Sequence, residues 1–166
     1  LLMARHEMVV EFAWAVPNEA ALAALVALSP IVELGAGSGY WASLLRERGA
    51  EVHAYDVTVG AANNWGHTKT WTRVDHGDET KVDDHQHCTL FLCWPPGGTL
   101  AVGALRRYRG DCIAYVGEGR GGSTATGEFF DELERHWVES QQVAIPQWDN
   151  MQDALHIYRR RAAEGG

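Results

Sequence analysis

The stretch Pro30-Ile-Val-Glu-Leu-Gly-Ala-Gly-Ser-Gly-Tyr-Trp41 determines how the rest of the sequence is interpreted. Its apolar run Ile31–Leu34 is typical of a short buried strand, and glycines follow at the alternate positions 35, 37 and 39. Apolar residues then continue at helical spacing to Leu45, before Gly49 ends the segment. Strand, glycine turn and helix form the first half of a nucleotide-binding βαβ unit, in which glycine lets a ligand approach the backbone closely.

A second predicted strand, Glu51–Asp56, follows the glycine turn and ends in a carboxylate. Asp56 lies about 20 residues after the glycines, where an acid commonly binds ribose hydroxyls. A dinucleotide-binding turn would have its third glycine at the position of Tyr40. Glu33 also places a carboxylate beside the turn, which suits an ammonium or sulfonium group better than a diphosphate. The pattern therefore disfavours an NAD-type oxidoreductase.

The motif Glu33-Leu-Gly35-Ala-Gly37-Ser-Gly39, followed by Asp56, resembles the first motif and the ribose-binding acid of the class I S-adenosylmethionine-dependent methyltransferases. The resemblance implies an α/β, Rossmann-like fold with a mostly parallel seven-stranded sheet, helices on both faces and a terminal antiparallel hairpin. It also implies an enzyme that uses S-adenosylmethionine as its cofactor. The cofactor-binding residues that it implies are Glu33, Gly35, Ala36, Gly37, Gly39, Asp56 and Asp78, the last as a contact to the adenine amino group.

A second apolar run, Thr89–Trp94, is typical of a central strand buried on both faces. The tetrapeptide Trp94-Pro95-Pro96-Gly97 that ends it resembles the fourth motif of the family, an Asn, Asp or Ser followed by Pro-Pro and an aromatic residue. Family members with that motif methylate amino nitrogens. This sequence departs from the motif because Trp94 has no side-chain acceptor oxygen and Gly97 has no ring. The backbone carbonyls of Trp94 and Pro95 remain able to orient an N–H group, which favours a nitrogen acceptor.

The glycine-rich loop 117–124 follows a predicted fifth strand and is expected on the same rim as Trp94. It is not a phosphate-binding P-loop, because no Lys precedes Ser123. Glu118 and Arg120 either offer opposite charges to a small polar substrate or belong to a simple connector, and the sequence leaves both readings open. The candidate catalytic residues are Trp94, Pro95 and Glu118.

We expect one domain over 1–166, in which 1–29 form a helical cap and 30–166 the Rossmann-like core. Asn18 is the predicted N-cap of the second cap helix. Trp65 and Trp71, in the loop after the second strand, either stack on a ligand or hold the loop to the core. The other predicted elements are helices over 1–16, 19–28, 100–108 and 126–139, and strands over 71–76, 111–116, 142–148 and 154–158, of which the last two form the hairpin.

The segment from Asp83 to Cys88 contains the residues that most resemble metal ligands, with His85 and His87 between them. The pattern H-x-H-C lacks a second ligand pair at the spacing of a structural zinc site. It also precedes a strand, at the edge of the sheet opposite the expected cofactor. The sequence alone therefore predicts a polar surface turn and no metal.

Composition limits the possible partners. The 166 residues carry a net charge of −8, which argues against a nucleic-acid partner because phosphate contacts need a basic face. The three cysteines form no close pair in sequence, which indicates a reducing compartment and a cytoplasmic location. No apolar run is long enough to span a membrane. We expect methyl transfer to a small-molecule acceptor; a non-catalytic S-adenosylmethionine-binding module is the alternative, and the oligomeric state is not predicted.

Overall fold

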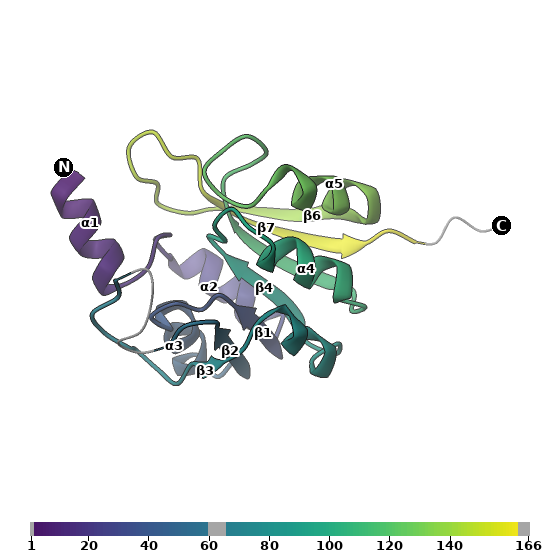
Figure 1. The fold of residues 1–166 in the computed structure, drawn as a ribbon, viewed down its shortest axis with the longest axis horizontal. Helices are drawn as coiled ribbons and strands as arrows, with labels where there is room; N and C mark the ends of the chain where they lie inside the picture. Colours follow the sequence, from purple (N-terminus) through teal and green to yellow (C-terminus); the bar gives the residue numbers. More distant parts are fainter. Residues whose placement is uncertain (1, 60–65, 163–166) are drawn as a thin grey trace.

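The computed structural model describes residues 2–59 and 66–162, which form a sheet between two layers of helices. The sheet has seven strands in the order β3-β2-β1-β4-β5-β7-β6 (Figure 1). The first five strands are parallel, whereas β7 pairs antiparallel with both β5 and β6. The predicted fold class is confirmed. The strands are β1 Ile31–Leu34, β2 Val52–Asp56, β3 Asp75–His76, β4 Thr89–Cys93, β5 Cys112–Gly117, β6 Trp137–Ala144 and β7 Ala154–Arg160.

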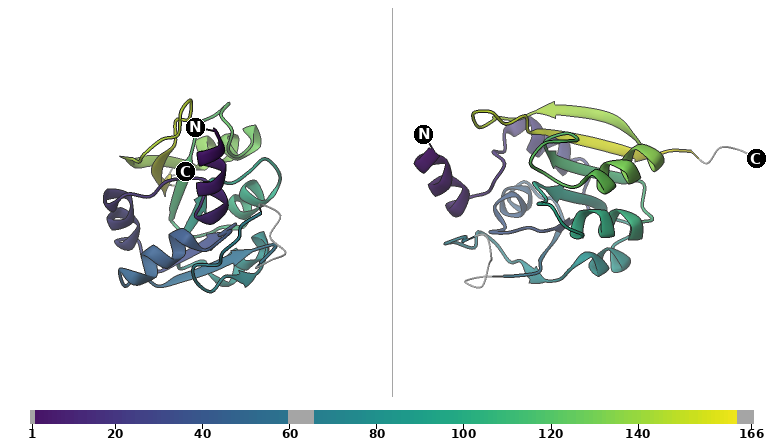
Figure 2. Two further views of the ribbon diagram at one scale, coloured as in Figure 1. Left: turned by 90° about the vertical axis from the view of Figure 1, so that its left-hand side faces the viewer. Right: turned by 45° about the horizontal axis from the view of Figure 1, so that its top comes forward.

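The helices cover both faces of the sheet (Figures 1 and 2). Helices α2 and α3 pack on one face, and η2, α4 and α5 pack on the other. Helix α1 lies beyond the carboxyl ends of the parallel strands. Among the described residues, no helix combines the length and apolar character that crossing a bilayer requires. The bounds are α1 Leu2–Glu11, α2 Glu19–Val26, α3 Tyr40–Glu47, the 3-10 helix η2 Glu79–Asp84, α4 Leu100–Arg107 and α5 Gly127–His136.

Strand β1 is buried on both faces, as its apolar run predicts. Ile31 belongs to the core cluster under α2 and α3, whereas Val32 and Leu34 belong to the cluster under α4 and α5. Ile31 pairs with the first residue of both β2 and β4, so these strands begin at the same level. Their carboxyl ends therefore meet at one edge of the sheet, where the strand order reverses between β1 and β4 and ligands of such sheets bind.

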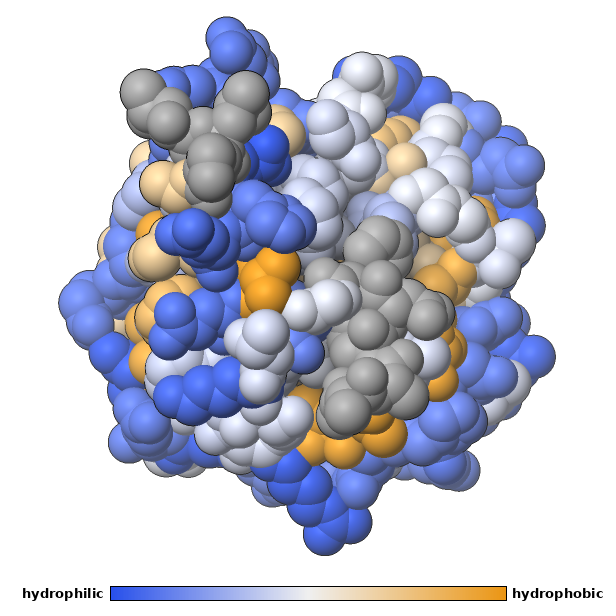
Figure 3. Space-filling model, turned by 60° about the vertical axis from the view of Figure 1, so that its left-hand side comes forward, coloured by the Kyte–Doolittle hydropathy of each residue, from blue (hydrophilic) through white to orange (hydrophobic). Residues whose placement is uncertain are grey.

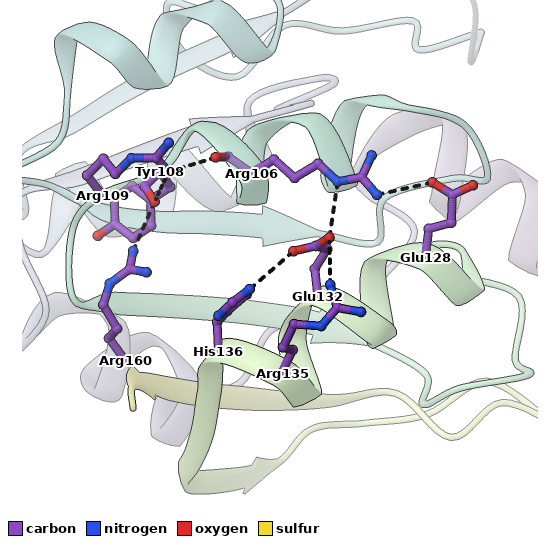
Figure 4. Close-up of polar contacts among 8 residues, drawn as sticks. All are labelled: Arg106, Tyr108, Arg109, Glu128, Glu132, Arg135, His136 and Arg160. Carbon is purple, nitrogen blue, oxygen red and sulfur yellow. Dashed lines mark hydrogen bonds and ion pairs between the residues drawn. The ribbon is translucent and has the colours of Figure 1, made fainter. Parts of the chain in front are cut away.

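A group of ion pairs joins α4 to α5 at the surface, with the partly buried Glu132 at its centre (Figure 4). The Glu132 carboxylate lies 3.3 Å from Nε of Arg106, 3.6 Å from Arg135 and 3.7 Å from His136. Arg106 also pairs with Glu128 at 3.4 Å. Exposed pairs of this kind contribute about 0–1 kcal/mol each. The buried apolar faces of α4 and α5 therefore account for most of the packing on this side of the sheet.

The predicted helix 126–139 is wrong in its last turn, because α5 ends at His136 and β6 begins at Trp137. Trp137 is buried in the core cluster and stacks on Tyr108 with ring centroids 5.9 Å apart, so it continues the apolar stripe of α5 although its backbone is extended. The rest of β6 is an edge strand with mostly exposed polar residues. Such a strand gives no alternation of apolar residues that the sequence could reveal.

The predicted strand 71–76 shortens to β3, Asp75–His76. The backbone before β3 bonds to other elements instead. The amide of Trp71 donates to the carbonyl of Ser38 at 2.8 Å, and Arg46 donates to the carbonyl of Arg73 at 2.7 Å. These contacts fasten the segment to the glycine turn and to α3, so it does not extend the sheet alongside β2.

Candidate functional site

The glycine turn between β1 and α3 needs glycine at each of its three positions. Gly35, Gly37 and Gly39 have φ angles of 72°, 57° and 76°, in the left-handed region that other residues rarely adopt. A Cβ atom on Gly37 would lie 2.9 Å from Nε2 of His67. A side chain at position 37 would therefore be strained by the backbone angles and would require the imidazole of His67 to move.

The turn is bonded to the acid at the end of β2. The amide of Gly37 donates to Oδ2 of Asp56 at 2.8 Å, and the amide of Thr58 donates to Oδ1 at 3.0 Å. Asp56 is 3% exposed. The amide of Ala36 also donates to the carbonyl of Tyr55 at 2.9 Å. The structure thus places the Asp56 carboxylate against the glycine turn, as the first motif and its downstream acid imply.

Glu33 is a buried acid beneath the same turn. It is 1% exposed, and its Oε2 has no hydrogen-bond partner among the described residues. Burial raises the pKa of Glu33 to about 8; the Asp56 charge adds to the rise and Arg46 opposes it. A carboxyl group held in this way is protonated at neutral pH, and a cation placed beside it would favour its charged form.

Trp94 stands at the carboxyl end of β4 in a constrained conformation. Its φ of 51° lies in the left-handed region, and its indole stacks on Trp14 with centroids 4.7 Å apart and planes 11° apart. Its Nε1 donates to the buried Asp153 carboxylate at 3.1 Å. Burial raises the pKa of Asp153, and the bond from Trp94 opposes that rise. The carbonyl of Pro95 accepts a bond from the amide of Ala125 at 2.7 Å.

These elements border one pocket, which is partly open to solvent and is lined mainly by apolar and aromatic side chains and by the glycine turn. Figure 3 shows a face on which hydrophilic residues form most of the rim, with paler residues of intermediate hydropathy and several hydrophobic residues between them. The predicted site residues that line the pocket are Glu33, Gly35, Ala36, Gly37, Asp56, Trp94 and Pro95.

Three predicted site residues do not line the pocket. Gly39 is the N-cap of α3. Asp78 is the N-cap of η2, and the hydroxyl and amide of Thr80, both donating to its carboxylate, lower its pKa. The Glu118 carboxylate accepts bonds from the amides of Ser123 at 2.6 Å and Gln152 at 3.0 Å, and these bonds lower its pKa against the opposing effect of burial. Glu118 thus fastens the glycine-rich loop to the β6–β7 connection.

Aromatic residues of the N-terminal segment complete the pocket. The sequence leaves two readings for Phe12 and Trp14: core packing, which it favours, and lining a lid over the cofactor. Both residues line the pocket together with Tyr40 and His67. Phe12 stacks on Trp71 with centroids 5.0 Å apart, and Nε1 of Trp71 donates to the carbonyl of residue 11 at 2.8 Å. Of the two readings for this indole, the structure shows contacts that hold its loop to the N-terminal segment. Trp65 lies outside the described residues.

No family model matches the sequence, and no curated protein is detectably related to it. Solved structures do share its fold. Magnesium protoporphyrin IX methyltransferase from Synechocystis PCC 6803, with S-adenosylhomocysteine bound, matches at a TM-score of 0.57 and 12% identity, over 95% of this chain and 84% of that one. The 1,6-didemethyltoxoflavin-N1-methyltransferase of Burkholderia thailandensis, also with S-adenosylhomocysteine, matches at 0.55 and 17% identity, over 87% and 80%.

TrmN from Thermus thermophilus matches at a TM-score of 0.51 and 13% identity, over 86% of this chain and 48% of that one. The chain thus spans about half the length of this neighbour. All three likenesses lie below the identity at which activity can be transferred, so they bear on the fold alone. The chain has the fold of the class I S-adenosylmethionine-dependent methyltransferases.

Proposed function

We propose that the chain binds S-adenosylmethionine between the glycine turn and Trp94 and catalyses transfer of its methyl group to a nitrogen of a small molecule. The single observation that carries the proposal is the bond of 2.8 Å from the Gly37 amide to Asp56. It joins the bare backbone of the turn to the acid expected to bind ribose. Two solved neighbours, at 12% and 17% identity, hold S-adenosylhomocysteine, and one of them is named an N1-methyltransferase.

The residues fit a cationic nucleoside ligand. Each Asp56 oxygen accepts one backbone N–H, which leaves lone pairs for two ribose hydroxyls. Glu33 lines the pocket with an unpartnered buried oxygen, and a nearby ammonium or sulfonium charge would compensate its ionised form. A diphosphate in the same place would repel the ionised carboxylate of Glu33. Asp78 stays a prediction as the adenine contact.

The cofactor supplies a methyl group on a sulfonium, a ready leaving group for in-line displacement. The chain itself orients the acceptor and excludes water. The stacked pair Trp14 and Trp94 forms an apolar wall that suits an aromatic or cationic acceptor. The Pro95 carbonyl oxygen has two lone pairs. One accepts the bond from the Ala125 amide, and the other remains for an N–H group of the molecule that receives the methyl group. We assign Glu118 to positioning of this rim through its bonds to Ser123 and Gln152.

The net charge of −8 supports a small-molecule acceptor over a nucleic acid. Incubating the protein with S-adenosylmethionine and matched panels of small amines, small alcohols and tRNA tests the acceptor. We expect S-adenosylhomocysteine to form with amines. Cofactor binding without turnover on any panel would favour the non-catalytic alternative.

Replacing Asp56 tests the cofactor site. Asp56→Ala should weaken S-adenosylmethionine binding more than about tenfold, because charged hydrogen bonds to ribose are lost. Calorimetry with S-adenosylmethionine, S-adenosylhomocysteine and NAD measures the effect. Asp75→Ala is the matched control: this acid lies on the neighbouring strand, and its half-exposed carboxylate pairs with Arg73. Tight binding of NAD, or unchanged cofactor affinity in Asp56→Ala, would contradict the assignment.

A further inference from the structure

Three potential metal ligands from separate elements meet on the α4 side of the sheet. His53 lies in β2, His85 follows η2, and Cys88 directly precedes β4. Their ligand atoms all lie within 4.8 Å of one another. His85 and Cys88 belong to the H-x-H-C segment, and His53 is the partner that the linear pattern lacked. It comes from 32 residues upstream of His85, so only the pairing of the strands brings it there.

His85 has one nitrogen in use and one without a partner. Its Nε2 lies 2.9 Å from the hydroxyl of Tyr55. Its Nδ1 is buried and has no hydrogen-bond partner among the described residues. A buried polar atom left in this state costs free energy and calls for an explanation such as an ion. If Nε2 carries the hydrogen and donates it to Tyr55, the lone pair of Nδ1 is free to bind a metal.

His53 is oriented in a comparable way by an acid. Its Nε2 lies 2.9 Å from Oε1 of Glu51, and its ring stacks on that of His85 with centroids 4.4 Å apart. Metal-binding histidines commonly donate their second N–H to a carboxylate, which fixes the tautomer and directs the other nitrogen toward the ion. Glu51 and Tyr55 are therefore placed to support the two imidazoles.

Cys88 supplies a thiol on the third side. It is 1% exposed, and its Sγ lies 3.5 Å from Nε2 of His87. His87 is thus close enough to provide a fourth ligand after a small movement. Two imidazoles and a thiolate, with a third imidazole or a water molecule, make up a ligand set that Zn²⁺ favours in tetrahedral sites.

We propose that His53, His85 and Cys88 bind a structural Zn²⁺ ion. Binding forms a zinc–thiolate bond and releases the Cys88 proton to solvent, with no oxidation or reduction. The ion would link β2 to the connection between η2 and β4. It would lie near the beginning of these strands, whereas the pocket lies beyond their carboxyl ends. We therefore assign it to stability and not to methyl transfer.

Metal titration of the full chain tests this site. After removal of metals with a chelator, Zn²⁺ should bind at one equivalent by calorimetry and raise the melting temperature. Co²⁺ in its place should give the near-ultraviolet absorption of a cobalt–thiolate bond. Cys88→Ser should abolish that absorption, and His53→Gln or His85→Gln should weaken Zn²⁺ binding by at least about tenfold.

Matched variants separate this cluster from other ligands. Cys112→Ser alters another buried thiol, and His136→Gln alters an exposed imidazole that pairs with Glu132; both should bind Zn²⁺ as the unaltered chain does. His53 is partly exposed, so His53→Gln tests the site without a large change in the core. No Zn²⁺ binding, or binding that persists in a Cys88→Ser/His85→Gln double variant, would overturn the proposal. Neither result would bear on S-adenosylmethionine binding at Asp56.

Discussion

Glu33 couples stability to pH because folding changes its proton affinity. In the folded chain burial raises its pKa from 4.5 to about 8, so the folded state keeps a proton that the unfolded state loses above pH 4.5. The contribution of this group to stability is therefore largest below pH 4.5 and declines as the pH rises toward 8. Above about pH 8 Glu33 is ionised in the folded chain, and its unpaired buried charge lowers the free energy of unfolding.

Glu33→Gln should remove this dependence and stabilise the chain by a few kcal/mol near the upper end of the window. Urea unfolding at about pH 5 and about pH 8 measures the effect. The control is Glu19→Gln, since the Glu19 side chain is 84% exposed. If Glu33→Gln and the unaltered chain lose stability equally between the two pH values, Glu33 is ionised in the folded state and the assignment of its pKa is wrong.

Single residues also show what the sequence can reveal about the site. Gly37 and Asp56 could be predicted because strand, glycine turn and following strand are local in sequence and the motif fixes their spacing. The contact between His53 and His85 could not be predicted, because it depends on which strands become neighbours in the sheet. The sequence leaves Trp14 two readings, core packing or a lid over the cofactor, and nothing in the surrounding sequence indicates that it stacks on Trp94.

Among the elements, the central strands and helices α2 and α4 were predicted to within about two residues. The helix expected over 1–16 ends at Glu11 as α1, and the strand expected over 142–148 lies at 137–144 as β6. Strands β1, β4 and β5 are nearly continuous apolar runs in the parallel part of the sheet, and burial on both faces leaves this simple signature. Two of the misjudged elements have polar surroundings: β6 is an exposed edge strand, and the backbone before β3 bonds to α3 and the glycine turn. Tertiary contacts, rather than local preference, decide such segments.

Helix α2 begins at a cap that the sequence predicts and the structure confirms. The Asn18 side chain accepts a bond from the Ala21 amide at 2.9 Å, and its amide nitrogen donates to the carbonyl of Ala144 at 2.9 Å. Asn18→Ala should lower the free energy of unfolding by about 1–2 kcal/mol. Asn18→Asp keeps the capping acceptor but not the donor, so its loss should be smaller. Urea unfolding ranks the three chains; equal stability of all three would contradict a capping role.

At the scale of the whole molecule, the cap expected over 1–29 divides into two parts. Helix α2 belongs to the core, because Ala21, Leu22 and Leu25 are buried against α3 and the sheet. The segment before it, residues 10–15, instead runs along the pocket. Side chains around the site donate to its carbonyls: Trp71 to that of residue 11, Ser38 to that of residue 12 and Trp41 to that of residue 15.

This strap of residues 10–15 connects cofactor binding to the N-terminal segment, and Trp71 is the contact that can be altered with least damage. Trp71→Phe keeps a ring near Phe12 but removes the bond of 2.8 Å to the strap. One hydrogen bond is worth about 1 kcal/mol, so we expect S-adenosylmethionine affinity to fall about fivefold, mainly through faster release. Calorimetry and stopped-flow fluorescence measure the two quantities. Arg73→Gln, in the same segment and 81% exposed, is the control. Unchanged release in Trp71→Phe would mean that the bond from Trp71 to the strap does not help to retain the ligand.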